Sequence, residues 1–251
     1  MLFVEKITVK FDAFTAVDEV SLRVAPGELV GLAGTNGAGK STLFAAIAGQ
    51  MRPCGGRIMF NGADIIRQAS HRRAAHGLAR TFQVPREFGS LTVLENLLAA
   101  APNEHSESMM AAWLFRRAAA RRESHWIRHA DAVLDLLGIS HIRELPAKGL
   151  SGGQKKLIEL ARILMRKPKI VLLDEPFAGV NPVLIGEIMK ALKTLSEQGI
   201  ALVVVEHHLQ ALKSLATRLV VMDQGKILAE GNPSEVLESE KVQAAYMGGV
   251  V

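Results

Sequence analysis

The sequence contains little cysteine and few aromatic residues. Its single cysteine, Cys54, has no second cysteine with which to form an internal disulfide or a thiolate zinc site. This composition favours a reducing compartment and argues against a redox function. Aromatic residues make up 5% of the chain, and only one of them is tyrosine. A nucleic-acid surface built from stacked, exposed rings would need more of them.

Long apolar runs are also missing. The longest candidates, residues 170–173 and 200–205, are far shorter than the roughly 18 residues that a membrane-spanning helix needs. Residues 1–10 alternate in the manner of a strand and lack the basic-then-apolar order of a signal peptide. We therefore expect a chain that crosses no membrane and stays in the cytosol. The net charge of +5 is compatible with nucleic acid or anionic lipid but selects neither.

What the sequence does contain is the composition of a globular α/β protein. Its 251 residues are 49% apolar and 22% charged, enough to bury a substantial core in one large domain or two small ones. Period-two runs at 2–9 and 17–25 predict strands, and residues 28–33 predict a short buried strand. A helix is expected over residues 41–48, ending near Gly49.

Later in the chain, apolar runs alternate with helical segments. The expected strands are residues 170–173, 201–205 and 218–222, and the expected helices are 182–196 and 209–216. This alternation predicts a parallel sheet.

The middle of the chain, from about residue 84 to residue 150, has a helical pattern instead. Helices are expected at 93–101, 109–120 and 125–137, with Gly138 as a cap after the last. We therefore expect a helical insertion between the strands of the sheet, and we find no internal repeat.

A basic cluster lies within this insertion. Its members are Arg116, Arg117, Arg121, Arg122 and Arg128. A solvated helix face and a surface for anionic lipid or a partner are both compatible with it, so the cluster identifies no site.

The first motif with chemical content is GTNGAGKS, residues 34–41, between a predicted strand and a predicted helix. It matches the phosphate-loop pattern G-x-x-x-x-G-K-[ST] in full. Its glycines let backbone N–H groups face a phosphate, Lys40 neutralises the β- and γ-phosphates, and Ser41 offers a hydroxyl to Mg²⁺. The alternative, an ordinary glycine-rich turn, does not account for the strand and helix on either side. We predict a nucleoside triphosphate site.

The second motif is IVLLDEP, residues 170–176, an apolar strand that ends in two acids. This arrangement can bring one carboxylate to a metal and the next to an attacking water. We expect Asp174 to hold Mg²⁺, mostly through water, and Glu175 to act as the general base. Alone, the motif would also fit two solvated acids in a turn.

The third motif is LSGGQ, residues 150–154, which precedes a helix expected over 155–165. Ser151 is positioned as its N-cap, and the glycines leave N–H groups exposed at the helix start, as in an anion site. A plain helix cap would have the same sequence. One triphosphate does not need two phosphate-facing helix ends in one chain, unless two chains share each nucleotide.

With these three motifs in this order, the chain resembles the ATP-binding-cassette (ABC) ATPases over almost its whole length. Further matches follow the family order: Gln83 is similar to the Q-loop glutamine, residues 178–181 to the D-loop, and His207 to the switch histidine. Asn181 differs from the Asp usual in D-loops. His208 is the neighbouring candidate for the switch residue.

The resemblance implies an α/β fold of the P-loop NTPase (RecA-like) type. Its core would have a mainly parallel sheet, with an N-terminal antiparallel β subdomain and an inserted α-helical subdomain. We expect a single ABC ATPase domain over 1–251, in which 1–83 and 156–251 form the core and the β subdomain. Residues 84–155 would form the helical subdomain that carries the LSGGQ motif.

The resemblance also implies ATP and Mg²⁺ as cofactors, and a second ABC subunit, identical or related, that shares each nucleotide. The expected catalytic residues are Glu175, His207, Gln83 and Lys40. The expected nucleotide-binding residues are Phe11, Gly34, Asn36, Gly37, Ala38, Gly39, Lys40, Ser41 and Thr42. Residues expected to act from the second subunit are Ser151, Gly152, Gly153 and Gln154. The expected metal ligands are Ser41, Gln83 and Asp174. Phe11 would stack on adenine, although Phe14 could replace it and core packing would equally explain an aromatic residue there.

Subgroup features resemble the ATPase subunits of branched-chain amino-acid importers, and urea or amide importers share them. These features are ARTFQ at 79–83, LTVLEN at 91–96, the extended insertion, residues 227–231 and AYMG at 245–248. The resemblance implies a separate permease, an extracytoplasmic solute-binding protein, a peripheral position at the cytoplasmic face of the inner membrane, and no nucleic-acid partner. Alternatives are a lipid-export ATPase and a non-transport cassette of the iron–sulfur assembly or DNA-repair type, although sustained heptads for long repair-type arms are absent from residues 84–150.

Overall fold

The computed structural model describes residues 1–81, 87–102 and 116–248, which form two compact units. The first unit comprises Met1–Gln83, Pro168–Ala178 and Leu192–Val251, and the second comprises Val84–Lys167 and Gly179–Ala191. Compared with the expected helical subdomain, the second unit also includes residues 156–167 and 179–191.

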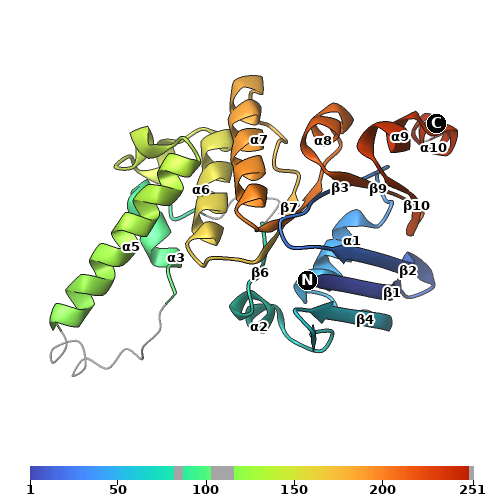
Figure 1. Ribbon diagram of the computed structural model, residues 1–251, viewed down its shortest axis with the longest axis horizontal. Coiled ribbons are helices and arrows are strands. Elements are labelled where there is room, and N and C mark those ends of the chain that lie inside the picture. The colour runs from blue at the N-terminus through green and yellow to red at the C-terminus, as the bar shows by residue number, and fades with distance from the viewer. Residues whose placement is uncertain (82–86, 103–115, 249–251) are drawn as a thin grey trace. The chain divides into compact units, whose positions relative to one another are not determined.

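A six-stranded sheet forms the centre of the first unit (Figure 1). In spatial order its strands are β10 (Lys226–Gly231), β9 (Arg218–Asp223), β3 (Leu29–Gly34), β8 (Ala201–Val205), β7 (Ile170–Asp174) and β6 (Leu78–Arg80). All neighbours are parallel except β10, which runs antiparallel to β9. The predicted mainly parallel sheet is therefore confirmed. Every residue of β3, β7 and β8 is buried, as expected for central strands covered on both faces.

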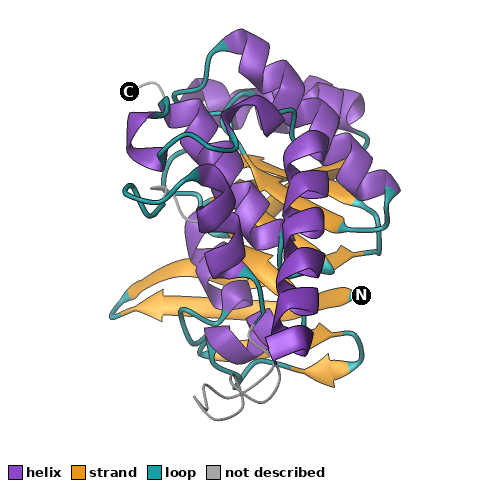
Figure 2. Cartoon of the chain, turned by 90° about the vertical axis from the view of Figure 1, so that its left-hand side faces the viewer, coloured by secondary structure: helices purple, strands orange, loops and turns teal. Residues whose placement is uncertain are grey.

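A second sheet in the same unit is antiparallel, which confirms the predicted N-terminal β subdomain. Its order is β2 (Phe14–Val24), β1 (Leu2–Phe11), β4 (Gly55–Phe60) and β5 (Ala63–Asp64). The period-two pattern predicted β1 and β2 but not the two shorter strands. Figure 2 shows both sheets in orange.

Helices join these strands. In the first unit they are α1 (Lys40–Ala48), α2 (Ser70–Ala75), α8 (Leu209–Leu215), α9 (Pro233–Glu238) and α10 (Glu240–Gly248). Helix α7 (Pro182–Glu197) begins in the second unit and ends in the first. Gly49 follows α1 in a left-handed conformation, φ 75°, as the predicted helix stop requires.

The second unit is mainly helical among its described residues. It contains α3 (Val93–Ala100), α5 (Arg116–Leu136) and α6 (Gly152–Leu164), with short 3₁₀ turns η1 (Ser140–Ile142) and η2 (Ala147–Gly149). Buried apolar side chains from all three helices, among them Leu97, Leu134 and Leu157, form its core. The LTVLEN motif begins α3: Thr92 and Glu95 form a reciprocal capping box, and Asn96 is buried with hydrogen bonds to the backbone of Phe88.

Helix α5 corrects one prediction. Separate helices were expected at 109–120 and 125–137, but residues 116–136 form one continuous helix. The intervening residues 121–124 are Arg-Arg-Glu-Ser, which include no proline or glycine and three residues that favour helix. Residues 103–115 lie outside the described part of the chain.

A buried arginine fastens the end of α1 to the rest of the first unit. The guanidinium of Arg73, which is 1% exposed, donates to the carbonyl oxygens of Ala46 and Ile47 at 2.8 and 2.7 Å. It also donates to the carbonyls of Ile66 and Gln68, at 2.9 Å each. Arg73 thus satisfies helix-end carbonyls that have no partner within α1, and its positive charge lies at the negative end of the helix dipole.

We expect Arg73→Met to lower the free energy of unfolding by about 3 kcal/mol, because it removes the guanidinium donors from the carbonyls of Ile47, Ile66 and Gln68; the carbonyl of Ala46 keeps the N–H of Gly49. Urea unfolding measures this loss. The matched control is Arg72→Met on the same helix, where the side chain is exposed. Equal stability of the two variants would contradict the capping role.

Candidate functional site

The loop between β3 and α1 requires glycine at two positions. Gly34 and Gly39 have φ angles of 149° and 95°. A Cβ atom on Gly34 would lie 2.2 Å from the carbonyl oxygen of Met222, and one on Gly39 would lie 2.3 Å from that of Ala16. The backbone therefore approaches its neighbours more closely than any side chain allows.

The remaining loop residues lie around the start of α1. Asn36 and Gly37 are exposed, whereas Ala38 is buried. Ser41 and Thr42 lie in the first turn of the helix, whose N–H groups lack intrahelical partners. A helix N-terminus preceded by a glycine-rich loop binds anions, and phosphate in particular.

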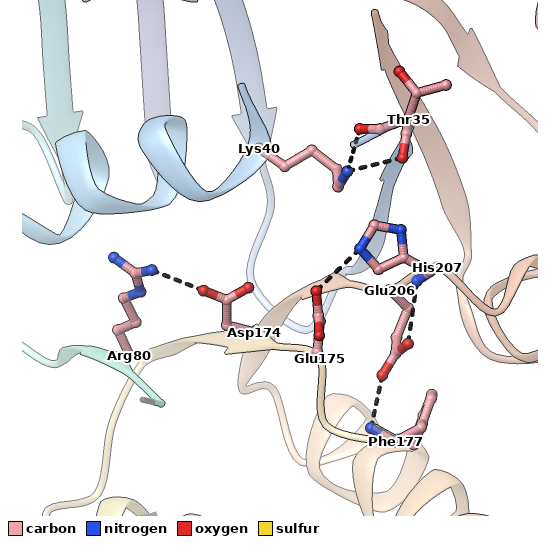
Figure 3. Close-up of polar contacts among 9 residues, drawn as sticks. Thr35, Lys40, Arg80, Asp174, Glu175, Phe177, Glu206 and His207 are labelled. Carbon is pink, nitrogen blue, oxygen red and sulfur yellow. Dashed lines mark hydrogen bonds and ion pairs between the residues drawn. The ribbon is translucent and has the colours of Figure 1, made fainter. Parts of the chain in front are cut away.

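Lys40 is turned back over the loop (Figure 3). Its Nζ donates to the carbonyl oxygens of Gly34 and Thr35, both at 2.8 Å. Burial holds the pKa of Lys40 below the usual lysine value, and the negative charges of Glu175 and Asp174 offset part of that effect. The site thus contains a partly desolvated cation beside the phosphate loop.

The two acids of IVLLDEP lie at the carboxyl end of β7. Asp174 is buried, and its N–H donates to Oγ1 of Thr81 at 3.0 Å. Its Oδ2 forms an ion pair with Nη2 of Arg80 at 2.8 Å. Glu175 has a left-handed backbone, φ 49°, and its N–H donates to the carbonyl oxygen of Val205 at 2.9 Å. Such a conformation costs energy for a residue with a Cβ atom and is found preferentially at functional sites.

The structure separates the two candidate histidines. Nε2 of His207 lies 3.0 Å from Oε1 of Glu175. His208 instead caps α8, because its Nδ1 accepts the N–H of Ala211 at 3.1 Å. Of these two histidines, His207 is the one with a hydrogen bond to Glu175, the predicted base.

Glu206 also belongs to this site, although none of the sequence motifs assigns it a role. Glu206 is 4% exposed, and its carboxylate accepts the N–H of Phe177 at 2.6 Å and that of His207 at 3.2 Å. It therefore holds the segment after Glu175 and the backbone of His207 together. The strand-ending position of Glu206 beside His207 was the only sequence signal for it.

The LSGGQ motif lies in the second unit. Ser151 is the predicted N-cap of α6: its Oγ accepts the N–H of Gln154 at 3.3 Å, and its own N–H donates to Oε1 of Gln154 at 3.0 Å. The helix begins at Gly152 rather than at the expected residue 155, because this reciprocal cap includes both glycines in the first turn. Ser151 and Gly152 are exposed, whereas Gly153 is buried with Leu184 where a Cβ atom would be.

Three further expectations have different outcomes. Phe11 and Phe14 are register partners in the β1–β2 hairpin and are 46% and 64% exposed, so core packing does not explain either. Asn181 accepts the N–H of Leu184 at 2.9 Å in the first turn of α7. Gln83 lies outside the described residues.

The fold and the loop together define a P-loop nucleotide-binding protein: a buried parallel sheet, a glycine-rich turn after β3, and acids at the end of β7. The ABC transporter family model matches residues 17–178, and a model described as branched-chain amino acid ATP-binding cassette transporter matches residues 226–251. The chain belongs to the ABC transporter family, and it is the ATP-binding, ATP-hydrolysing type of subunit.

Two groups of relatives, whose names state different transport roles, are similarly identical in sequence to this chain. BraF of Pseudomonas aeruginosa, a high-affinity branched-chain amino acid transport ATP-binding protein, is 36% identical and covers 99% of this chain and 98% of its own. LptB of Haemophilus influenzae, a lipopolysaccharide export system ATP-binding protein, is 35% identical and covers 99% and 97%. A nucleotide-free ATP-binding cassette from an ABC transporter has a TM-score of 0.84 at 35% identity, over 98% of each chain.

Within residues 1–81, 87–102 and 116–248, we find no helix that is both long and apolar enough to cross a membrane.

We expect Glu206→Gln to lower the rate of ATP hydrolysis about tenfold while leaving nucleotide affinity unchanged. The amide replaces one acceptor oxygen with a donor that faces a backbone N–H, so the segment joining Glu175 and His207 loosens. Steady-state kinetics and equilibrium nucleotide binding measure the two effects. Glu5→Gln, on an exposed position of β1, is the matched control. A normal rate in Glu206→Gln would show that the catalytic segment is held without this carboxylate.

Proposed function

We propose that this chain is the ATPase subunit of an importer for branched-chain amino acids or related small polar solutes such as urea and amides. The observation that carries this proposal is the match of residues 226–251 to the branched-chain amino acid cassette model, outside the nucleotide-binding motifs that all such ATPases share. The BraF relative supports it. The LptB relative, at similar identity and coverage, favours lipid export as the second candidate.

In this proposal, the phosphate loop binds ATP. Backbone N–H groups around Gly37, Ala38 and Gly39, with Asn36 and Thr42 nearby, contact the phosphates, and Lys40 supplies positive charge. The loop supports this role because Gly34 and Gly39 could not carry side chains without collision. Exposed Phe11 is available to stack on the adenine ring.

The residues also fit Mg²⁺. Ser41 and Asp174 offer the hard oxygen ligands that this ion takes, and the proposed third ligand, Gln83, lies outside the described residues. When bound, Mg²⁺ would neutralise charge on the β- and γ-phosphates. Asp174 comes from the buried end of β7, and its backbone is fixed by Thr81.

For hydrolysis, Glu175 would take a proton from the water that attacks the γ-phosphorus, while the bond to the ADP oxygen breaks. His207 would orient the carboxylate through the 3.0 Å contact. The left-handed backbone of Glu175, supported by the hydrogen bond to Val205, sets the direction of the side chain.

A second ABC subunit would complete each site with its own Ser151, Gly152, Gly153 and Gln154. The exposed start of α6 supports this proposal, because an anion can approach its N–H groups from solvent. Binding of ATP between two subunits would close them, and hydrolysis would let them reopen. A permease would convert this motion into transport of solute received from a solute-binding protein. The chain would then lie at the cytoplasmic face of the inner membrane, without a nucleic-acid partner.

We predict that Glu175→Gln retains ATP affinity, hydrolyses ATP about 10²- to 10⁴-fold more slowly, and accumulates as an ATP-dependent dimer. Glutamine keeps the shape of the glutamate side chain, but its amide cannot accept a proton from the attacking water. Phosphate release and light scattering measure the two effects. Glu197→Gln, at an exposed end of α7, is the control, and Lys40→Ala should lose ATP affinity. A wild-type rate in Glu175→Gln would remove it from the role of base.

The transport proposal is tested by reconstitution with the membrane proteins that co-purify with the chain. We expect ATP-dependent uptake of labelled leucine, isoleucine or valine, or of urea or an amide, into proteoliposomes, and loss of uptake with Glu175→Gln. Transfer of lipopolysaccharide without solute uptake would support the lipid-export alternative instead. Co-purification with a soluble scaffold alone would contradict transport.

A further inference from the structure

Arg80 lies beside the proposed metal ligand. It is the last residue of β6, and its Nη2 pairs with Oδ2 of Asp174 at 2.8 Å (Figure 3). The two side chains are only 15% and 6% exposed. Water therefore screens this pair weakly, and the carboxylate obtains its countercharge from the guanidinium.

The position of Arg80 is fixed from a second side. Its Nη1 donates to Oε1 of Gln50 at 2.6 Å, and its guanidinium carbon lies 5.8 Å from the centre of the Phe44 ring. Phe44 belongs to α1, and Gln50 follows the Gly49 cap of that helix. Arg80 therefore bridges the end of the phosphate-loop helix and the end of β7, instead of extending into solvent.

These contacts give Asp174 a permanent positive neighbour. A guanidinium remains charged at any pH that the folded protein experiences, unlike a histidine or a buried lysine. A metal ion at Asp174 would meet a cation already on the same carboxylate. Two cations at one acid repel each other, so each weakens the binding of the other.

We propose that Arg80 is a positioning residue that neutralises Asp174 and weakens Mg²⁺ binding there, so that the metal binds together with the nucleotide rather than before it. This inference rests on the proposed metal role of Asp174. The negative charge of the triphosphate offsets the repulsion between Arg80 and a second cation at the site. Without nucleotide, the carboxylate pairs with Arg80.

The test is the ratio of the dissociation constant for ADP measured in EDTA to that measured in excess Mg²⁺, for wild type and Arg80→Gln. ADP excludes hydrolysis from the readout, and calorimetry measures both constants. We expect the ratio to rise about five- to tenfold in Arg80→Gln, because the unpaired Asp174 carboxylate then repels metal-free ADP, while Mg²⁺ no longer competes with a guanidinium for that carboxylate. An unchanged or smaller ratio would overturn the inference.

Three variants control this result. Arg57→Gln makes the same chemical change at an exposed ion pair with Asp64 and should keep the wild-type ratio. Arg80→Lys retains the charge and should stay within about twofold of wild type. In an Asp174→Asn background, Arg80→Gln should change the ratio little, since its effect requires the carboxylate; an undiminished rise there would contradict the inference.

If Arg80→Gln does not fold, Gln50→Leu serves as the second variant. Gln50→Leu keeps Arg80 but removes its hydrogen bond to Gln50, leaving its contact with the Phe44 ring. We expect the ratio of ADP dissociation constants to rise about twofold. No rise would overturn the inference. If the wild-type protein does not bind ADP, or if its ADP affinity is the same with and without Mg²⁺, the proposed nucleotide and metal site is contradicted instead.

Discussion

The geometry of the site depends on the attraction between positively and negatively charged side chains at the carboxyl edge of a buried parallel sheet. Strands β3, β7 and β8 have no exposed residue, so polar groups can gather only where the strands end. There Lys40 and Arg80 face Asp174 and Glu175. Each acid thereby has a cation or histidine nearby, which makes the burial of Asp174 tolerable.

The sheet edge also explains why residues distant in sequence work together. Thr81, directly after β6, holds the backbone of Asp174, and Glu206, directly after β8, holds the segment after Glu175. Parallel strands with helical crossovers bring their carboxyl ends to one edge, whichever order the chain visits them. The contacts that support the acids therefore come from neighbouring strands and not from their own loop.

Much of this arrangement could be predicted from the sequence, because the strongest signals are local. The phosphate loop, the buried strand before Asp174 and the Ser151 cap each depend on a few consecutive residues, and all lie in the expected elements. Arg80, although it lies in the ARTFQ match, and Glu206 carry no local signal for their contacts: either would be ordinary at a solvated strand end, and the sheet order is what brings their partners close. The break expected within α5 was wrong because short polar stretches can continue a helix when they contain neither glycine nor proline.

Selection for stability alone would act against Glu175, because its backbone is left-handed. Glycine, or to a smaller extent asparagine, would relieve the strain of that conformation at the position where a carboxylate is proposed to act as general base. Sequences drifting without a need for turnover should therefore lose the acid early. Retention of Glu175 in a group of related sequences would indicate that selection for ATP hydrolysis is stronger there than selection for stability.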